Sequence, residues 1–350
     1  MLQKNRFFFP LLGVVLLITL FFCIALGAVD IRFDEMISAL RHFAAGKPPT
    51  SIYEGVFLQI RLPRVLLCAI TGAILASSGV LLQGLFRNPI VESGLIGTSA
   101  GAAFGASLMF VLLAQVSKEI KSFAGPMLVP AFAFMGGLIA TFFVYSIAKS
   151  NKRISVTSLL LVGIAVNAIG LSGTGFMSYI ARDPQARSIT FWNLGTFSGA
   201  TWLQVIITGV VASGVLIFSM RYTKKLNALI LGEAEASNLG VDTEKLKKRV
   251  LILTTAMISV ATAFVGVISF LGLIVPHILR LIIGSDNRRL LPASMLSGAI
   301  LLSIADLLAR VLLAPAEIPV GIITSVVGAP LFIILLKRFN ILNQKGGDNG

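Results

Sequence analysis

Residues 7–29 read FFFPLLGVVLLITLFFCIALGAV, an apolar run of 23 residues that only Thr19 interrupts. A helix of about 20 apolar residues spans the roughly 30 Å hydrocarbon core of a bilayer. The apolar core of a signal peptide is shorter, with about 7–15 residues. We therefore expect a retained membrane-spanning helix at the start of the chain.

Further apolar runs of this kind follow along the chain. In lipid a helix satisfies its own backbone hydrogen bonds without water, so each run predicts a spanning helix. The run at 270–284 is short and contains Pro276, which predicts a short or broken segment. The fold class is thus an all-α polytopic membrane protein with ten transmembrane helices, predicted near 7–29, 62–84, 94–114, 127–148, 155–177, 202–220, 250–269, 270–284, 290–313 and 320–336.

The composition supports a membrane protein. Of the 350 residues, 56% are hydrophobic and 13% are charged, with a mean hydropathy of +0.92, whereas soluble domains carry about 25% charged residues. The net charge of +14 would suggest nucleic acid in a soluble protein, but cytoplasmic loops of membrane proteins are also rich in Lys and Arg. Ten spans with both termini in the cytoplasm place 19 of the 29 basic residues inside. We therefore expect no nucleic-acid partner.

The chain is expected to form a single transmembrane domain over 1–350, with a polar cytoplasmic loop at about 221–249 and a C-terminal tail at 339–350. Within the loop, the glycines at 232 and 240 predict one or two short helices with a glycine stop between them. Cys23 and Cys68 lie in apolar runs and are interpreted as small core residues.

Signatures of enzymes are missing. The one Gly-Lys pair, Gly46-Lys47, is followed by Pro48 and does not form a phosphate loop. His42 and His277 lack the spacing of a metal-binding helix, so no metal site is expected. Asp306 is the one acid within a predicted span, and Arg310 lies one turn further on, where the two can pair. A proton-coupled carrier would need more buried acids, which weakens that alternative.

Three arginines lie at predicted outer helix ends, against the positive-inside bias. They are Arg61, Arg64 and Arg310. Such arginines can bind carboxylates of an external partner, or they can anchor helix ends at the membrane interface.

An ordered set of motifs resembles the permease subunits of type II ABC importers for iron-siderophore complexes, haem and cobalamin. The matching stretches run from about residue 55 to 338. They are Arg61-Leu62-Pro63-Arg64, Gln83-Gly84-Leu85-Phe86-Arg87-Asn88-Pro89, Gly94-Leu95-Ile96-Gly97 with Ser99 and Gly101, Leu231-Gly232-Glu233, Gly272-Leu273-Ile274-Val275-Pro276-His277-Ile278-Leu279-Arg280, and Glu317-Ile318-Pro319-Val320-Gly321 with Gly328-Ala329-Pro330.

The resemblance implies a multi-pass protein of the bacterial inner membrane that forms a homodimer. Two cytoplasmic ATPase subunits and a periplasmic binding protein would be its partners, besides membrane lipid. The chain itself would be no enzyme and bind no cofactor, because the partner ATPase uses the ATP. Arg61, Arg64 and Arg310 would dock acidic residues of the binding protein. The segment that couples the chain to the ATPases would lie at about 226–243. Its residues would be Leu231, Gly232, Glu233, Leu239 and Gly240.

The cargo is suggested by residues 182–195. Arg187, Thr190, Phe191 and Trp192 form an Arg-x-x-Thr-Phe-Trp run that resembles the haem-transporting branch. Arg182 and Arg187 can pair with haem propionates, with a siderophore carboxylate, or simply mark a surface loop. We therefore expect import of haem or a related iron chelate from periplasm to cytoplasm by alternating access. The alternatives are a ferric-siderophore or cobalamin permease and, less favoured, an ion-coupled secondary transporter.

Overall fold

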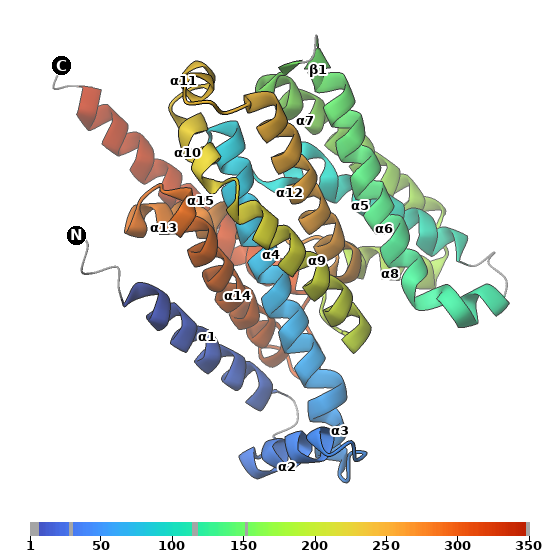
Figure 1. Cartoon of the computed structure of the whole chain (residues 1–350). Helices are drawn as coiled ribbons and strands as arrows, with labels where there is room; N and C mark the ends of the chain where they lie inside the picture. Colours follow the sequence, from blue (N-terminus) through green and yellow to red (C-terminus); the bar gives the residue numbers. More distant parts are fainter. Residues whose placement is uncertain (1–6, 28–30, 114–117, 151–152, 348–350) are drawn as a thin grey trace.

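A computed structural model describes residues 7–27, 31–113, 118–150 and 153–347. In these ranges the chain is a bundle of helices with one two-stranded hairpin (Figure 1). The helices in the predicted spanning segments are α1 (Phe8–Ala25), α4 (Leu62–Phe86), α5 (Thr98–Leu112), α6 (Lys118–Ala148), α7 (Val156–Ile180), α9 (Trp202–Met220), α12 (Thr243–Val265), α13 (Leu271–Ile283), α14 (Asn287–Val311) and α15 (Val320–Gly347).

Shorter elements connect these helices. They are α2 (Phe33–Ala44), α3 (Ile52–Val56), a π-helical turn η1 (Phe57–Arg61), a 3₁₀ turn η2 (Ser93–Ile96), the hairpin β1 (Lys149–Ser150) and β2 (Arg153–Ile154), α8 (Asp183–Asn193), α10 (Thr223–Ile230) and α11 (Glu233–Asn238).

The membrane-spanning segments agree with the sequence prediction. Seven helical stretches in the described residues are long and apolar enough to cross a bilayer, and three shorter apolar helices, α5, α13 and part of α15, occupy the remaining predicted positions. The prediction of a short segment at 270–284 is confirmed by α13, which has 13 residues and contains Pro276.

Some boundaries differ from the prediction. The helix expected from residue 62 continues upstream to Ile52, because the π-helical turn η1 accommodates Pro63, which has no backbone N–H to donate. The segment expected as a tail from residue 339 prolongs α15 to Gly347. The basic start at Lys4 and Arg6 and the last residues 348–350 lie outside the described residues.

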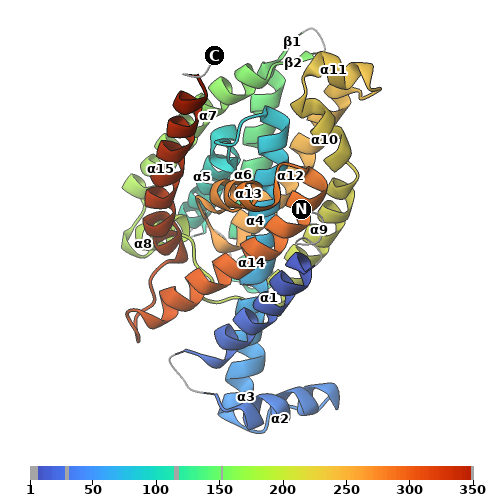
Figure 2. The ribbon, with the colours of Figure 1, turned by 90° about the vertical axis from the view of Figure 1, so that its left-hand side faces the viewer.

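Helix α4 is the centre of the bundle. Residues Ile52–Phe86 are 83% buried over their most apolar window, and α4 packs against α9, α12, α13 and α14 (Figures 1 and 2). The apolar windows of α1, α7 and α9 are only 11%, 22% and 22% buried. Their large side chains are therefore placed outward, as expected where lipid replaces water.

Small residues allow close helix contacts. A Cβ on Gly101 of α5 would collide with the backbone of Gly136 on α6, and a Cβ on Gly136 would collide with Gly101 in return. Gly101 and Gly136 therefore let the backbones of α5 and α6 come into direct contact, as is common for helices that associate in lipid.

Two amphipathic helices were not predicted from the sequence. Helix α2 buries Met36 and Ala39 against Phe57 and Leu58, and exposes its polar face. Helix α8 follows α7 after a sharp turn. Neither helix contains a long apolar run, the pattern that predicts a spanning helix.

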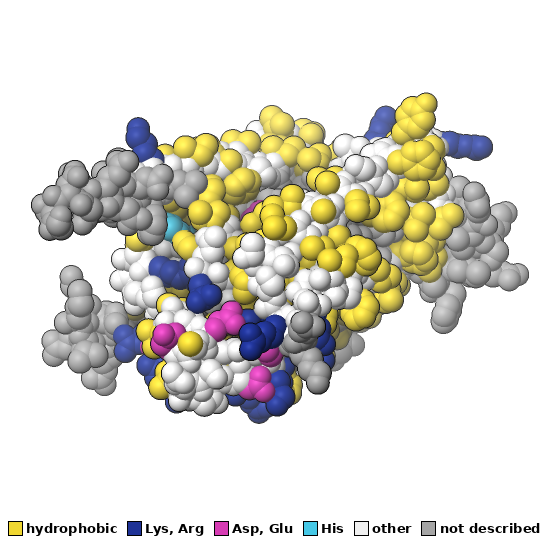
Figure 3. Space-filling model, turned by 90° about the horizontal axis from the view of Figure 1, so that it is seen from above, with side chains coloured by type: hydrophobic (Ala, Val, Ile, Leu, Met, Phe, Trp, Pro, Cys, Tyr) yellow, Lys and Arg dark blue, Asp and Glu magenta, His cyan; other side chains and the backbone are white. Residues whose placement is uncertain are grey.

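The two ends of the bundle differ in their elements. The hairpin, α10 and α11 lie at one end, and α2 and α3 lie at the opposite end (Figure 1). Figure 3 views the molecule from the α11 end and shows charged side chains of both signs gathered there, with apolar side chains over much of the remaining surface.

Candidate functional site

At the α2–α3 end, three arginines and two acids form a cluster that we call the outer arginine cluster (Arg61, Arg64, Asp306, Arg310 and Glu317). Arg64 donates from Nε and Nη2 to Asp306, at 3.2 and 2.9 Å, and from Nη1 to Glu317 at 2.8 Å. Arg310 Nε lies 3.1 Å from Asp306 Oδ2. The side chain of Asp306 is 2% exposed, so one buried carboxylate balances two guanidinium groups.

The same cluster holds the C-terminal end of α1. Arg61 Nη1 donates to the carbonyl oxygens of Ile24 and Ala25, both at 2.7 Å. Arg310 Nη2 donates to Cys23 O at 2.9 Å. The last carbonyls of a helix have no partner within it and carry partial negative charge, so cations stabilise this end. The cluster therefore joins α1, α4 and α14.

The structure thus brings together the three arginines for which docking was predicted, and it buries them. Arg61, Arg64 and Arg310 are 5%, 7% and 7% exposed. The predicted pair of Asp306 and Arg310 is present, but the contact of Asp306 with Arg64, which lies 242 residues away, was not predicted. Direct docking would require carboxylates of a partner to replace those of this chain.

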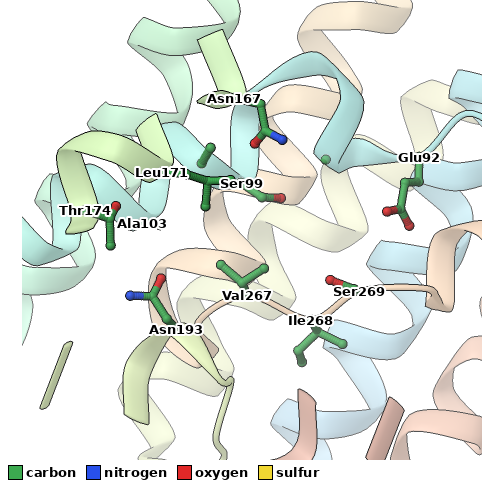
Figure 4. A pocket seen from close by; sticks show the side chains of 12 residues that line it. Glu92, Ser99, Ala103, Asn167, Leu171, Thr174, Asn193, Val267, Ile268 and Ser269 are labelled. Atoms are coloured by element: carbon green, nitrogen blue, oxygen red, sulfur yellow. The ribbon is translucent and has the colours of Figure 1, made fainter. Parts of the chain in front are cut away.

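Between the two ends, α5, α7, α8 and two loops line a partly open cavity of about 350 Å³ (Figure 4). Asn167 of α7, Asn193 of α8 and Glu92 of the loop before η2 line it from different elements. Glu92 Oε2 accepts a hydrogen bond from Phe270 N at 3.3 Å. Burial raises the pKa of Glu92, and this hydrogen bond opposes the rise. The remaining polar lining comes from Ser99, Thr174 and Ser269.

Arg182, Arg187 and Trp192, from the segment interpreted as contacting the cargo, lie at the start of α8 or on it, and the last residue of this helix, Asn193, lines the cavity. Arg182 directly precedes α8 and Arg187 lies on it, and both are exposed. Trp192 packs against a cluster of buried alanines, Ala102, Ala106, Ala133 and Ala263. Among the described lining residues the cavity includes Asn193, the neighbour of Trp192. The sequence did not predict that Asn167, Asn193 and Glu92 line a cavity, because they are single polar residues without a repeated spacing.

At the α11 end, the predicted coupling residues form two short helices. Helix α10 ends at Ile230 and α11 begins at Glu233, with Gly232 between them at a φ of 130°, a conformation that favours glycine. The prediction of short helices with a glycine stop is confirmed. Leu231 and Leu239 are 66% and 65% exposed on this surface, and Gly240 follows with a φ of 79°.

A buried lysine anchors α11 to the bundle. Lys247 Nζ donates to Glu233 at 2.7 Å, to Glu244 at 2.9 Å and to Ile154 O at 3.0 Å. Glu244 in turn accepts from Ile154 N at 2.7 Å. This Lys247 cluster (Ile154, Glu233, Glu244 and Lys247) joins α11 and α12 to the hairpin between α6 and α7.

The start of α14 holds α10 in place. Asn227 Nδ2 donates to Asp286 Oδ1 at 2.6 Å, and Asn227 Oδ1 accepts from Asn287 N at 2.9 Å. Hydrogen bonds from Arg288 and Asn227 lower the pKa of Asp286 to about 2.

These features define a multi-span helical membrane protein with a partly open cavity whose lining includes several polar side chains. Residues 15–338 match the FecCD transport family, and the chain belongs to this family. It is the permease subunit of an ABC importer for iron chelates, haem or cobalamin, is not itself an enzyme, and is a multi-pass membrane protein. Such permeases work with ATPase and binding-protein partners, and the ATPase uses the ATP.

Named relatives cover most of the chain. The hemin transport system permease protein HmuU of Yersinia pestis is 40% identical over 81% of this chain and 83% of its own. The vitamin B12 import permease BtuC of Vibrio cholerae is 35% identical over 83% and 85%. The Fe(3+) dicitrate permease FecD of Escherichia coli is 37% identical over 81% and 85%.

A solved structure of a metal-chelate type ABC transporter in an inward-facing conformation has the same fold. It superposes with a TM-score of 0.81 at 30% identity and covers 94% of this chain and 98% of that chain. The fold class and family that the motifs predicted are therefore confirmed.

Proposed function

We propose that this chain carries haem, or a related iron chelate, from the periplasm to the cytoplasm of a bacterium by alternating access. The observation that carries the proposal is the cavity lined by Glu92, Asn167 and Asn193 among the helices of a family permease. Haem is favoured by the similarity to HmuU and by the run at 187–192. Ferric-siderophore and cobalamin transport are the alternatives, since relatives named for Fe(3+) dicitrate and for vitamin B12 are nearly as similar.

The size of the cavity favours a path completed by a second copy of the chain. At about 350 Å³ the cavity lies near the lower end of ligand pockets, which occupy roughly 300–1,000 Å³. Helices α7 and α15 leave apolar side chains exposed, among them Leu161, Ile164, Val326 and Val327. A homodimer that covers part of this surface would enlarge the cavity to the size of a chelate.

The α11 end of each chain suits contact with an ATPase subunit, so a homodimer would bind two of them. Leu231 and Leu239 offer exposed apolar side chains on either side of α11, and Gly232 and Gly240 bound this helix. Glu233 links it to Lys247. Movement of a docked ATPase would therefore pass through α11 to α12 and the hairpin, with this end in the cytoplasm as the positive-inside bias predicts.

We expect the binding protein to dock at the opposite end. Its carboxylates would replace the present partners of Arg61, Arg64 and Arg310. Charge reversal at Arg61 together with Arg64 should abolish stimulation of ATP hydrolysis by the loaded binding protein in the reconstituted complex. Reversal of Arg41, an exposed arginine of α2, is the matched control and should preserve stimulation. A charge-reversed complex that remains monodisperse and fully stimulated would refute the docking role.

Transport itself is tested in proteoliposomes. The chain should accumulate cargo only with its ATPase and ATP, and accumulation against a gradient by the chain alone would overturn the proposal. Asn167→Leu in the cavity should lower the transport rate, whereas Ser146→Leu on the exposed face of α6 should not. Titration of the cognate binding protein with haem, siderophores and cobalamin identifies the cargo, and tightest binding of cobalamin would contradict haem.

An ion-coupled carrier is a weaker candidate. Proton relays in membranes use buried acids or histidines that can change protonation. Asp306 is held between Arg64 and Arg310, so its charge is already used within the fold. Uptake that depends on a proton gradient and persists without ATP would support this alternative.

A further inference from the structure

A second cavity of about 350 Å³ lies at the α11 end, between the C-terminal end of α4, the end of α10 and α13. Arg87 and Arg280 line it, together with His277 and Gln83. None of the lining residues that the structure describes is Asp or Glu. The cavity is therefore cationic.

Arg280 has no acidic partner in the described part of the chain. Its Nη1 donates to the neutral amide oxygen of Gln83, and no ion pair joins its guanidinium group to a carboxylate of the described residues. Gln83 is itself held by hydrogen bonds from Nε2 to Gly272 O at 3.2 Å and Leu273 O at 3.4 Å. A largely buried charge without a counter-charge is costly, so an external anion beside Arg280 would stabilise this arrangement.

Arg87 provides a second guanidinium group that is only weakly paired. Its Nη2 lies 4.0 Å from Glu233 Oε1, while the other oxygen of Glu233 is held by Lys247 at 2.7 Å. Arg87 caps α4 with a φ of 52°, and its backbone N–H donates to Gln83 O. The backbone of α4 thus places Arg87 beside the residue that orients Arg280.

The border of the cavity is apolar. Ile230 and Leu281 line it and are 45% and 61% exposed, and the neighbouring Ile282 is 62% exposed. Arginine pairs with phosphate through two parallel hydrogen bonds. Basic pockets between helices at the cytoplasmic surface bind phosphate headgroups, and adjacent apolar side chains can contact the acyl chains.

We propose that this cavity binds the phosphate headgroup of an anionic phospholipid of the cytoplasmic leaflet, with Arg280 and Arg87 as its ligands. The phosphate supplies the charge that balances Arg280, and Ile230 and Leu281 contact the lipid tails. The site connects α4 and α13 to the end of α10, next to the proposed coupling helices. It does not depend on which chelate is transported.

The test uses the purified full-length chain in a non-ionic detergent, with bound lipid measured by native mass spectrometry. Phosphatidylglycerol should bind at least about tenfold more tightly than phosphatidylcholine, which corresponds to about 1.4 kcal/mol. Arg280→Gln and Arg87→Gln should each remove most of this preference, and Arg280→Lys should retain part of it. Arg221→Gln, an exposed arginine outside the cavity, is the control and should bind as the unchanged chain does.

Other results would overturn the proposal. Equal affinity for the two lipids, or an unchanged preference in both glutamine variants, would exclude the site. Inorganic phosphate that displaces phosphatidylglycerol at an equal concentration would show a free-anion site and refute the lipid. If Arg280→Gln does not fold, Arg87→Gln still decides, because the side chain of Arg87 is 40% exposed and its ion pair with Glu233 is as long as 4.0 Å.

Discussion

The outer arginine cluster and the Lys247 cluster are both centred on a buried charge, but their surroundings differ. The side chain of Asp306 is 2% exposed, and the side chains of its partners Arg64 and Arg310, on transmembrane helices, are 9% and 7% exposed. Lys247 is 3% exposed, but its partners Glu233 and Glu244 are 40% and 31% exposed. Water can replace a lost partner in the second cluster and hardly in the first.

This difference assigns the two clusters different mechanical roles. Helical segments supply four of the five charges of the outer cluster, and only Glu317 lies in the loop before α15, so we infer that the cluster fixes α1, α4 and α14 relative to one another. The Lys247 cluster attaches the six-residue helix α11 through solvated carboxylates, which exchange partners at lower cost. A joint of this kind suits a helix that must move with a partner, while the outer cluster suits a fixed frame.

Removal of the buried carboxylate should have the largest effect. Asp306→Asn leaves Arg310 without a carboxylate partner among the described residues and leaves Arg64 with the half-exposed Glu317 only, which we expect to cost about 3–5 kcal/mol of stability. Denaturation with SDS in mixed micelles measures this loss. Asp183→Asn, at the exposed start of α8, is the control and should change stability by less than about 0.5 kcal/mol. Equal losses in the two variants would refute a fixed frame.

Removal of the buried lysine should have a smaller and more local effect. Lys247→Met leaves Glu233 and Glu244 to water and Ile154 O unsatisfied, at a cost of about 1–3 kcal/mol. Hydrogen exchange should become faster in α11 and in the hairpin but not in α14. Lys245→Met is the matched control, because the side chain of Lys245 is 73% exposed and its ion pair is with Asp242, on the same helix end. Unchanged exchange in α11 would show that Lys247 does not hold this helix.

The sequence predicted those features that repeat locally. Runs of apolar residues located the ten spanning segments, and the four-residue spacing predicted the pair of Asp306 and Arg310. Gly232 marked the break between α10 and α11. Each of these signals lies within one helix or loop, where the 3.6-residue period and backbone conformation determine the outcome.

The sequence pattern did not predict contacts between segments that are far apart in the chain. Arg64 and Asp306 are 242 residues apart, and Glu92 meets Phe270 across 178 residues. The order in which ten similar apolar helices pack is set by side-chain fit and small residues, which single-sequence periodicity does not encode. The cavity therefore emerged only from the three-dimensional arrangement, and so did the burial of the three arginines.

The exposed member of the outer cluster provides a finer comparison. Glu317 binds Arg64 at 2.8 Å but is 41% exposed, so its pair resembles a surface salt bridge. Glu317→Gln should therefore cost at most about 1 kcal/mol, well below Asp306→Asn, in the same SDS titration. If Glu317→Gln lost as much stability as Asp306→Asn, solvent exposure would not explain how much each carboxylate partner of Arg64 contributes.

The smallest expected effect concerns Asp286, which caps α14 and binds Asn227 of α10. Its pKa is lowered from 3.8 to about 2, so its contribution to stability is present above about pH 4 and is lost as the pH falls toward about 2. Asp286→Asn should remove this part of the acid sensitivity. The thermal unfolding midpoint of the unchanged chain should fall more between about pH 5 and pH 3 than that of the variant. Identical acid shifts in both proteins would show that the attachment of α10, unlike that of α11, does not depend on a carboxylate charge.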